Sequence, residues 1–174
     1  LGWLTITDDQ LAHRHKLAEM AEDARSGGFS HVLLLGMGGS SLAPEVLRSV
    51  LGVAPGWPRL HVLDSTDPAA VRAAHTPPAT TLFLLASKSG TTIEPNALAA
   101  HFRRVLVDAG IARWADHFIA ITDAGTELAH RAAAEGFRDT FINPSDIGGR
   151  FSALSFSAFA SLMTFSARKA GTSS

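Results

Sequence analysis

The stretch HVLLLGMGGSSLAPEVL, residues 31–47, indicates the fold most directly because it joins three kinds of segment. Residues 31–36 form a continuous apolar run with the length of one β-strand. The Gly-rich segment GMGGSS, residues 36–41, comes next, and SLAPEVLRSVLG, residues 41–52, has the composition of a helix. Pro44 is expected in the first turn of that helix, where proline is tolerated. The stretch therefore predicts a strand, a tight turn and a helix in series.

The same alternation of apolar runs and amphipathic stretches continues along the chain. A helix is expected before the first strand, opened by a capping box at Thr7 and Gln10 and ending near Arg25, and another helix from about Leu154. Strands that are apolar on both faces and separated by helices imply a parallel sheet covered on both sides. The predicted fold class is therefore α/β, a five-stranded doubly wound parallel sheet with helices on both faces. The predicted strands are residues 31–36, 60–64, 81–86, 117–122 and 139–143.

The composition is that of a globular domain. The chain has 174 residues, of which 46% are hydrophobic, a formal net charge of −1 and no cysteine. A domain of this length buries roughly 70% of its unfolded surface, and Lys and Arg residues that are spread along the chain without a large cluster argue against a nucleic-acid partner. No apolar run approaches the roughly 20 residues that cross a bilayer, so no membrane association is expected. Both ends look cut from something longer, and a reducing cytoplasm is compatible with the lack of cysteine.

Ligands of a doubly wound sheet bind beyond the carboxyl ends of its strands. The loops after the first, second, third and fifth predicted strands contain the polar segments GMGGSS, DSTD, SKSGTT and NPSDIGGRFS. In GMGGSS, the glycines let the backbone approach a ligand, and Ser40 and Ser41 lie beside the unpaired N–H groups of a helix start. This environment favours a phosphate or a sugar oxygen. The alternative is a tight turn in which a serine only caps the helix.

The segment SKSGTT after the third predicted strand concentrates groups that bind phosphate. Lys88 provides a full positive charge, and Thr92 is also a candidate cap of the next helix. Capping needs one such residue, so several hydroxyls at one strand end indicate an anion. The alternative is an ordinary turn rich in Ser and Thr. The hydroxyl and amide groups of the segment belong to Ser87, Ser89, Thr91 and Thr92.

Two charged residues at other strand ends have competing interpretations. Arg150 in DIGGRFS is a candidate for stabilising an anionic intermediate or a phosphate, and the alternative is a surface ion pair with Asp146. Asp64 ends the second strand, where a dinucleotide-binding fold reads ribose hydroxyls, but Ser41 stands where that fingerprint has Gly or Ala. Asp64 is therefore expected to stabilise its own loop. No histidine is nominated, and no carboxylate pair has metal-ligand spacing, so no metal site is predicted.

Three segments in order along the chain resemble the phosphoglucose isomerase (glucose-6-phosphate isomerase) family. They are LLLGMGGSSLAPEVL, SKSGTTIEPNAL and INPSDIGGRFSALS. The resemblance is to the first sugar-isomerase (SIS) domain of the family, a SIS-type, flavodoxin-like sandwich, and it covers essentially the whole chain. The segment LHVLDSTDPAAV further resembles the isomerase half of fused transaldolase–phosphoglucose isomerase proteins. Residues 1–174 are therefore expected to be a single SIS domain of a longer isomerase with two SIS domains.

This resemblance implies a reaction and a set of roles. The family interconverts glucose 6-phosphate and fructose 6-phosphate through a cis-enediol and needs no metal or organic cofactor. By position, Gly39 and Ser40 match a sugar-contacting pair, and Arg150 matches the arginine that stabilises the enediolate. Phe151 stands where a tyrosine is common. The residues that match the substrate-binding phosphate motif are Ser87, Lys88, Ser89 and Thr92.

The resemblance also implies what this chain lacks. The family's proton-transferring glutamate, ring-opening histidine and late lysine match no position here, so the chain alone is expected to be inactive. A small-molecule sugar phosphate is the expected partner, a homodimer is expected for the full-length protein, and the cytoplasm is the expected location. Two alternatives stay open, namely a SIS-type module that senses a sugar phosphate without converting it, and a nicotinamide dinucleotide-binding domain.

Overall fold

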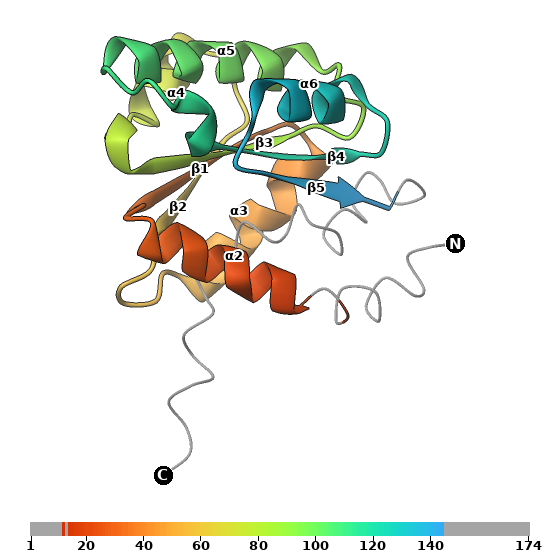
Figure 1. Cartoon of the computed structure of the whole chain (residues 1–174). Coiled ribbons are helices and arrows are strands. Elements are labelled where there is room, and N and C mark those ends of the chain that lie inside the picture. The colour runs from red at the N-terminus through yellow and green to blue at the C-terminus, as the bar shows by residue number, and fades with distance from the viewer. Residues whose placement is uncertain (1–11, 13, 145–174) are drawn as a thin grey trace.

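A sheet of five parallel strands forms the centre of the computed structural model, which describes residue 12 and residues 14–144 (Figure 1). The order of the strands across the sheet is β2-β1-β3-β4-β5, and every neighbouring pair is parallel. Each observed strand boundary lies within one residue of the predicted one. The strands are β1 (His31–Gly36), β2 (Arg59–Leu63), β3 (Thr81–Ala86), β4 (Phe118–Asp123) and β5 (Asp139–Asn143).

Helices cover both faces of this sheet (Figure 1). One face carries α2 (Arg14–Ser26) and α3 (Gly39–Leu51), and the other carries α4 (Pro68–Ala73), α5 (Ile93–Asp108) and α6 (Glu127–Glu135). The short 3-10 helices η2 (Pro78–Thr80) and η3 (Trp114–His117) precede β3 and β4. The predicted doubly wound α/β fold is confirmed. Within the described part of the chain, no helix has both the length and the apolar character that a membrane span requires.

Each face of the sheet has its own hydrophobic core, because the side chains of a strand alternate between the two faces. Leu34 belongs to the core on the side of α2, whereas Leu33 belongs to the core on the side of α5 and α6. The central strand β3 is buried along its whole length, as expected for a parallel sheet between two helix layers. The ring of Phe83 in β3 is tilted against that of Phe102 and stacks on that of Phe118, with centroid distances of 5.0 and 5.1 Å.

The helix α3 begins earlier than predicted. The N–H groups of Ser41 and Leu42 donate to the Gly38 carbonyl at 3.2 and 3.0 Å, so Gly38 is the residue before the helix. Pro44 is therefore the sixth residue of α3, and its predicted place in the first turn is wrong. Proline has no N–H to donate to the carbonyl of Ser40, four residues earlier, so the start of α3 has one helical hydrogen bond fewer.

Two other predicted helices lie partly or wholly outside the described residues. The helix α2 ends at Ser26, one residue beyond the predicted end near Arg25. Its predicted start at Thr7 and the helix predicted from about Leu154 lie outside the described residues.

The direction of strand order changes at β1, and this places the loops that hold the candidate site. From β1 the chain moves outward to β2, and from β2 it returns past β1 to β3. The last residues of β1 and β3, Gly36 and Ala86, are register partners, so the two loops that follow start side by side. Doubly wound sheets bind their ligands at such a switch point, beyond the carboxyl ends of the strands.

Candidate functional site

A cavity of about 660 Å³ lies at the carboxyl edge of the sheet, among the loops that follow β1, β3 and β4. Its volume is within the range of about 300–1,000 Å³ that is usual for small-molecule sites. The structure brings all six predicted substrate-binding residues to its lining, while their role in binding stays a prediction. Arg150, the predicted catalytic residue, and Asp146 lie outside the described residues. The six lining residues are Gly39, Ser40, Ser87, Lys88, Ser89 and Thr92.

Glycines and the first turn of α3 form the wall of the cavity on the β1 side. Gly38 has a φ of +56°, a backbone conformation that favours glycine. A Cβ atom on Gly36 would lie 3.2 Å from the Cβ of Ser40, so glycine lets α3 start close to the strand. In the described part of the chain no side chain caps α3, and the Ser41 hydroxyl instead donates to the Gly38 carbonyl at 3.1 Å. The alternative of a serine cap is therefore wrong, because both serines lie inside the helix.

The loop after β3, here named the SKSGTT loop, holds its hydroxyl groups in a relay. The buried Ser87 hydroxyl accepts from the Gly90 N–H at 3.2 Å and donates to Thr92 Oγ1 at 3.2 Å. Because a hydroxyl that accepts a hydrogen bond keeps its own hydrogen, Thr92 is able to donate onward to a ligand in the cavity. The Ser89 and Thr91 hydroxyls form a second pair at 3.0 Å. The loop therefore presents hydroxyl donors on short side chains, and hydrogen bonds within the loop already hold these side chains in position.

Thr92 occupies the position just before α5, but its side chain does not cap that helix. As far as the described residues show, no side chain makes a capping hydrogen bond at the start of α5. The interpretation of Thr92 as a cap is therefore wrong, because its hydroxyl is engaged by Ser87 beside the cavity. The N-termini of α3, α5 and α6 all border this cavity. Each helix N-terminus carries a partial positive charge, so the arrangement favours an anion.

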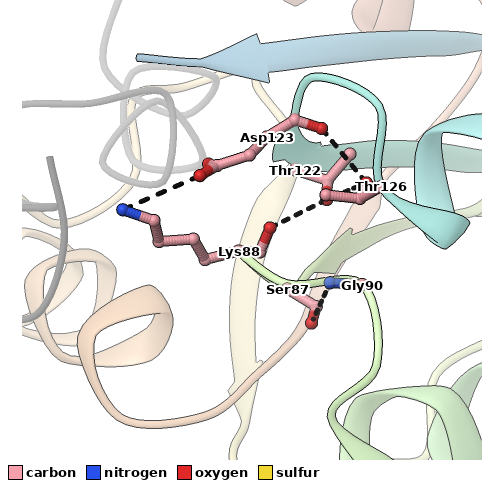
Figure 2. A network of polar contacts seen from close by, with 6 residues as sticks. All are labelled: Ser87, Lys88, Gly90, Thr122, Asp123 and Thr126. Carbon is pink, nitrogen blue, oxygen red and sulfur yellow. Dashed lines mark hydrogen bonds and ion pairs between the residues drawn. The ribbon is translucent and has the colours of Figure 1, made fainter. Parts of the chain in front are cut away.

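The end of β4 holds Lys88 in place (Figure 2). The ammonium group of Lys88 lies 3.7 Å from Asp123 Oδ2, and the Lys88 carbonyl accepts from the Asp123 N–H and the Thr122 hydroxyl, both at 3.3 Å. The Asp123 side chain is 13% exposed and also lines the cavity. Burial raises the pKa of Asp123, and attraction to Lys88 opposes this shift with a smaller effect. A carboxylate–ammonium pair therefore stands beside the groups that favour an anion.

Sequence reasoning missed the loop after β4, which supplies Asp123, Ala124 and Thr126 to the cavity. Thr126 caps α6 by accepting from the Ala129 N–H at 3.2 Å, and its hydroxyl lies 2.8 Å from that of Thr122. A signal for this loop was present in the segment TDAGT, which combines a carboxylate, a glycine and a helix cap at a strand end. The sequence does not show that β4 lies next to β3, the arrangement that brings this loop to the cavity.

The loop after β2 is built differently from the loops that line the cavity. The Ser65 hydroxyl accepts from the Asp67 N–H at 3.1 Å, and Asp67 caps α4 by accepting from the N–H groups of Ala69 and Ala70. The stabilisation of this loop by Asp64 stays a prediction. Within residues 14–144, no group of three or more His, Asp or Glu side chains is arranged to hold a metal ion.

Comparison with known sequences points to one family. The family model described as phosphoglucose isomerase matches residues 7–166. The chain is 35% identical over 154 residues to a glucose-6-phosphate isomerase of Chlamydia muridarum, an alignment that covers 87% of this chain and 28% of the relative. It is 38% identical over 141 residues to a glucose-6-phosphate isomerase of Thermosynechococcus vestitus, covering 75% of this chain and 25% of the relative. The chain thus spans 25–28% of the length of these two relatives.

Comparison with solved structures agrees with the sequence matches. A crystal structure of a glucose-6-phosphate isomerase from Chlamydia trachomatis has a TM-score of 0.77 and 31% identity, covering 86% of this chain and 29% of that chain. A hypothetical protein from Thermus thermophilus has a TM-score of 0.79 and 31% identity, covering 94% of this chain and 39% of that chain.

Proposed function

This chain belongs to the phosphoglucose isomerase family, and from that premise we propose that its cavity binds a hexose 6-phosphate such as glucose 6-phosphate. The observation that carries the proposal is that two polar segments far apart in the sequence, GMGGSS and SKSGTT, line one cavity at the switch point of the sheet. Three helix N-termini border the same cavity, and an anionic group gains from all of them.

The phosphate group is assigned to the SKSGTT loop. Its oxygens would accept from the hydroxyls of Ser87, Ser89 and Thr92, with Lys88 beside them. A hydrogen bond to a charged group contributes roughly 1.5–3 kcal/mol, so three of them account for the roughly 4–8 kcal/mol of a millimolar-to-micromolar site. The side chain of Lys88 is 45% exposed, and solvent screening therefore reduces its share.

The sugar is assigned to the opposite wall of the cavity. Gly39 and Ser40 lie at the start of α3, where the backbone approaches closely and a hydroxyl is available to the hydroxyl groups of a hexose. In this proposal Arg150 stabilises negative charge on the enediolate, a role that follows from the family resemblance. These roles make the chain the substrate-binding part of an isomerase.

Interconversion of glucose 6-phosphate and fructose 6-phosphate is proposed for a longer protein, because this chain spans 25–28% of the length of two isomerase relatives. Proton transfer between two carbons needs a general base, and the family's glutamate and histidine match no position here. The longer protein is proposed to be a cytoplasmic homodimer that needs no cofactor, in keeping with the family resemblance.

Calorimetric titration of the chain with glucose 6-phosphate, fructose 6-phosphate and NAD tests the assignment. We expect both sugar phosphates to bind and NAD not to bind, and we expect Ser87→Ala to weaken the binding of both sugar phosphates. Binding of NAD alone would instead support the dinucleotide-binding alternative. The chain is expected not to convert fructose 6-phosphate, and substantial turnover would contradict the assignment of the base to other segments. A longer protein that binds glucose 6-phosphate without turnover would support the sensing alternative.

A further inference from the structure

Asn96, in the first turn of α5, holds the backbone of the SKSGTT loop. Its amide nitrogen donates to the Gly90 carbonyl at 3.0 Å and to the Thr92 carbonyl at 2.9 Å. A side-chain amide nitrogen carries two hydrogens, so these two bonds use both. Asn96 lines a separate cavity of about 450 Å³ together with Gly90 and Thr91, and the described lining of the proposed substrate cavity does not include it. Any effect of Asn96 on a ligand in the substrate cavity therefore passes through the loop.

Arg131 of α6 determines which way the Asn96 amide points. Its Nη1 donates to Asn96 Oδ1 at 3.0 Å. The reversed amide would place its oxygen against two carbonyls and its nitrogen against a guanidinium, which has no acceptor. The observed orientation is thus the one in which all three hydrogen bonds form. Arg131 therefore directs both donors of Asn96 toward the loop.

Gly90 connects Asn96 to the hydroxyl relay. The Gly90 carbonyl accepts from Asn96, and the Gly90 N–H donates to the Ser87 hydroxyl at 3.2 Å. The Ser87 hydroxyl in turn donates to Thr92 Oγ1, whose own backbone carbonyl is the second acceptor of Asn96. Asn96 is thus bonded to the backbone at both ends of the relay. A shift of its amide would move the hydroxyls that face the cavity.

We propose that Asn96 is a positioning residue that holds the SKSGTT loop in the conformation that binds phosphate, and that Arg131 fixes Asn96 in turn. This inference rests on the proposed binding of a hexose phosphate. Short hydroxyl donors bind an anion well only when the backbone already places them, because ordering a loop upon binding costs affinity. The hydrogen bonds from Asn96 remove much of that cost in advance.

The decisive variant is Asn96→Asp, which keeps the size of the side chain and the acceptor toward Arg131 but replaces the donor by a second oxygen. Two hydrogen bonds to the loop are then replaced by contacts between acceptors. We expect the Kd for glucose 6-phosphate, measured by calorimetry, to rise by about tenfold or more. Arg131→Met, which leaves the Asn96 amide but removes its anchor, is expected to raise the Kd by about threefold. The Gly90 amide signal in a nitrogen-15 spectrum is expected to move in both ligand-free variants.

Asp67→Ala is the matched control for a general loss of stability. It removes the cap of α4, which does not line the substrate cavity, and it should leave the Kd unchanged. If the wild-type chain binds glucose 6-phosphate and Asn96→Asp binds it equally well, the positioning role is wrong while the proposed function stands. Equal weakening by Asn96→Asp and Asp67→Ala would also overturn it. If Asn96→Asp does not fold, an unchanged Kd for Arg131→Met overturns the positioning role. If the wild-type chain does not bind glucose 6-phosphate, the positioning role and the proposed function are both wrong.

Discussion

A Cβ atom on Gly90 would lie 2.8 Å from the backbone nitrogen of Leu128. Gly90 also has a φ of +75°, which side chains rarely allow. The SKSGTT loop therefore packs with its backbone directly against the first turn of α6, and glycine alone fits this contact without strain.

Gly90→Ala is expected to lower the free energy of unfolding by about 2–4 kcal/mol, because it adds a steric clash to the cost of the left-handed conformation. Urea denaturation measures the loss. The matched control is Gly110→Ala, since Gly110 has a φ of +78° but a Cβ atom added there would meet no atom within 4 Å. That variant is expected to cost about 1–2 kcal/mol, the cost of the backbone conformation alone. Equal losses for the two variants would mean that the contact with Leu128 has no energetic weight.

Asp123 is expected to make stability depend on pH in a direction opposite to that of an ordinary ion pair. Burial raises the pKa of Asp123, and its Oδ1 is buried without a hydrogen-bond partner in the described part of the chain. A raised pKa means that the folded state favours the protonated carboxyl group. This stabilisation is present below the ordinary value of about 3.9 and is lost as the pH rises through the raised pKa.

Urea denaturation at a series of pH values tests this effect by comparing the wild-type chain with Asp123→Asn, which cannot ionise. The stability of the variant relative to the wild-type chain is expected to increase from about pH 4 to about pH 7. A relative gain for the wild-type chain over that range would show that attraction to Lys88 outweighs burial.

His31 and His61 stack across β1 and β2, with ring centroids 5.4 Å apart. Burial lowers the pKa of both side chains, and for His61 the charges of His31, Arg59 and Arg48 lower it further. The Nε2 atom of His61 is buried and has no hydrogen-bond partner among the described residues. A lowered pKa gives stability that is present above the ordinary value of about 6.5 and is lost as the pH falls through the lowered pKa.

His61→Gln is therefore expected to lose less stability than the wild-type chain when the pH falls from about 7 to about 5. Thermal unfolding at several pH values measures the difference. The wild-type chain, measured over the same pH range, provides the reference. If the stability of His61→Gln falls with decreasing pH as steeply as that of the wild-type chain, groups other than His61 cause the acid sensitivity.

The hydroxyl relay from Ser87 to Thr92 predicts different effects for two substitutions at one position. Thr92→Val keeps the shape of the side chain but removes the oxygen that accepts from Ser87 and that is proposed to donate to a ligand. It is expected to raise the Kd for sulfate and for glucose 6-phosphate by about tenfold. Thr92→Ser keeps the hydroxyl, and its Kd should stay within about threefold of the wild-type value. Equal binding by Thr92→Val and the wild-type chain would remove Thr92 from the site.

The accuracy of prediction differed between strands and helix starts for a physical reason. Strands such as residues 81–86 were predictable because a buried parallel strand is a continuous apolar run bounded by polar residues. The start of α3 was not, since glycine has low helix propensity, whereas in the structure the helix begins at Gly39 and the Gly38 carbonyl accepts from the N–H groups of Ser41 and Leu42. Thr92 likewise has the residue type of a cap, but Ser87 engages its hydroxyl.

The amino-acid sequence by itself determined the secondary-structure elements and the chemistry of each loop, because apolar periodicity, glycine and hydroxyl groups act on their near neighbours in the chain. It also identified two of the three segments whose residues line the cavity, GMGGSS and SKSGTT. The tertiary structure decided which loops meet. The order β2-β1-β3-β4-β5 places SKSGTT between GMGGSS and TDAGT, and so adds Asp123 and Thr126 to the site. Strand pairing depends on packing between distant segments, and no local pattern records which strand becomes the neighbour of another.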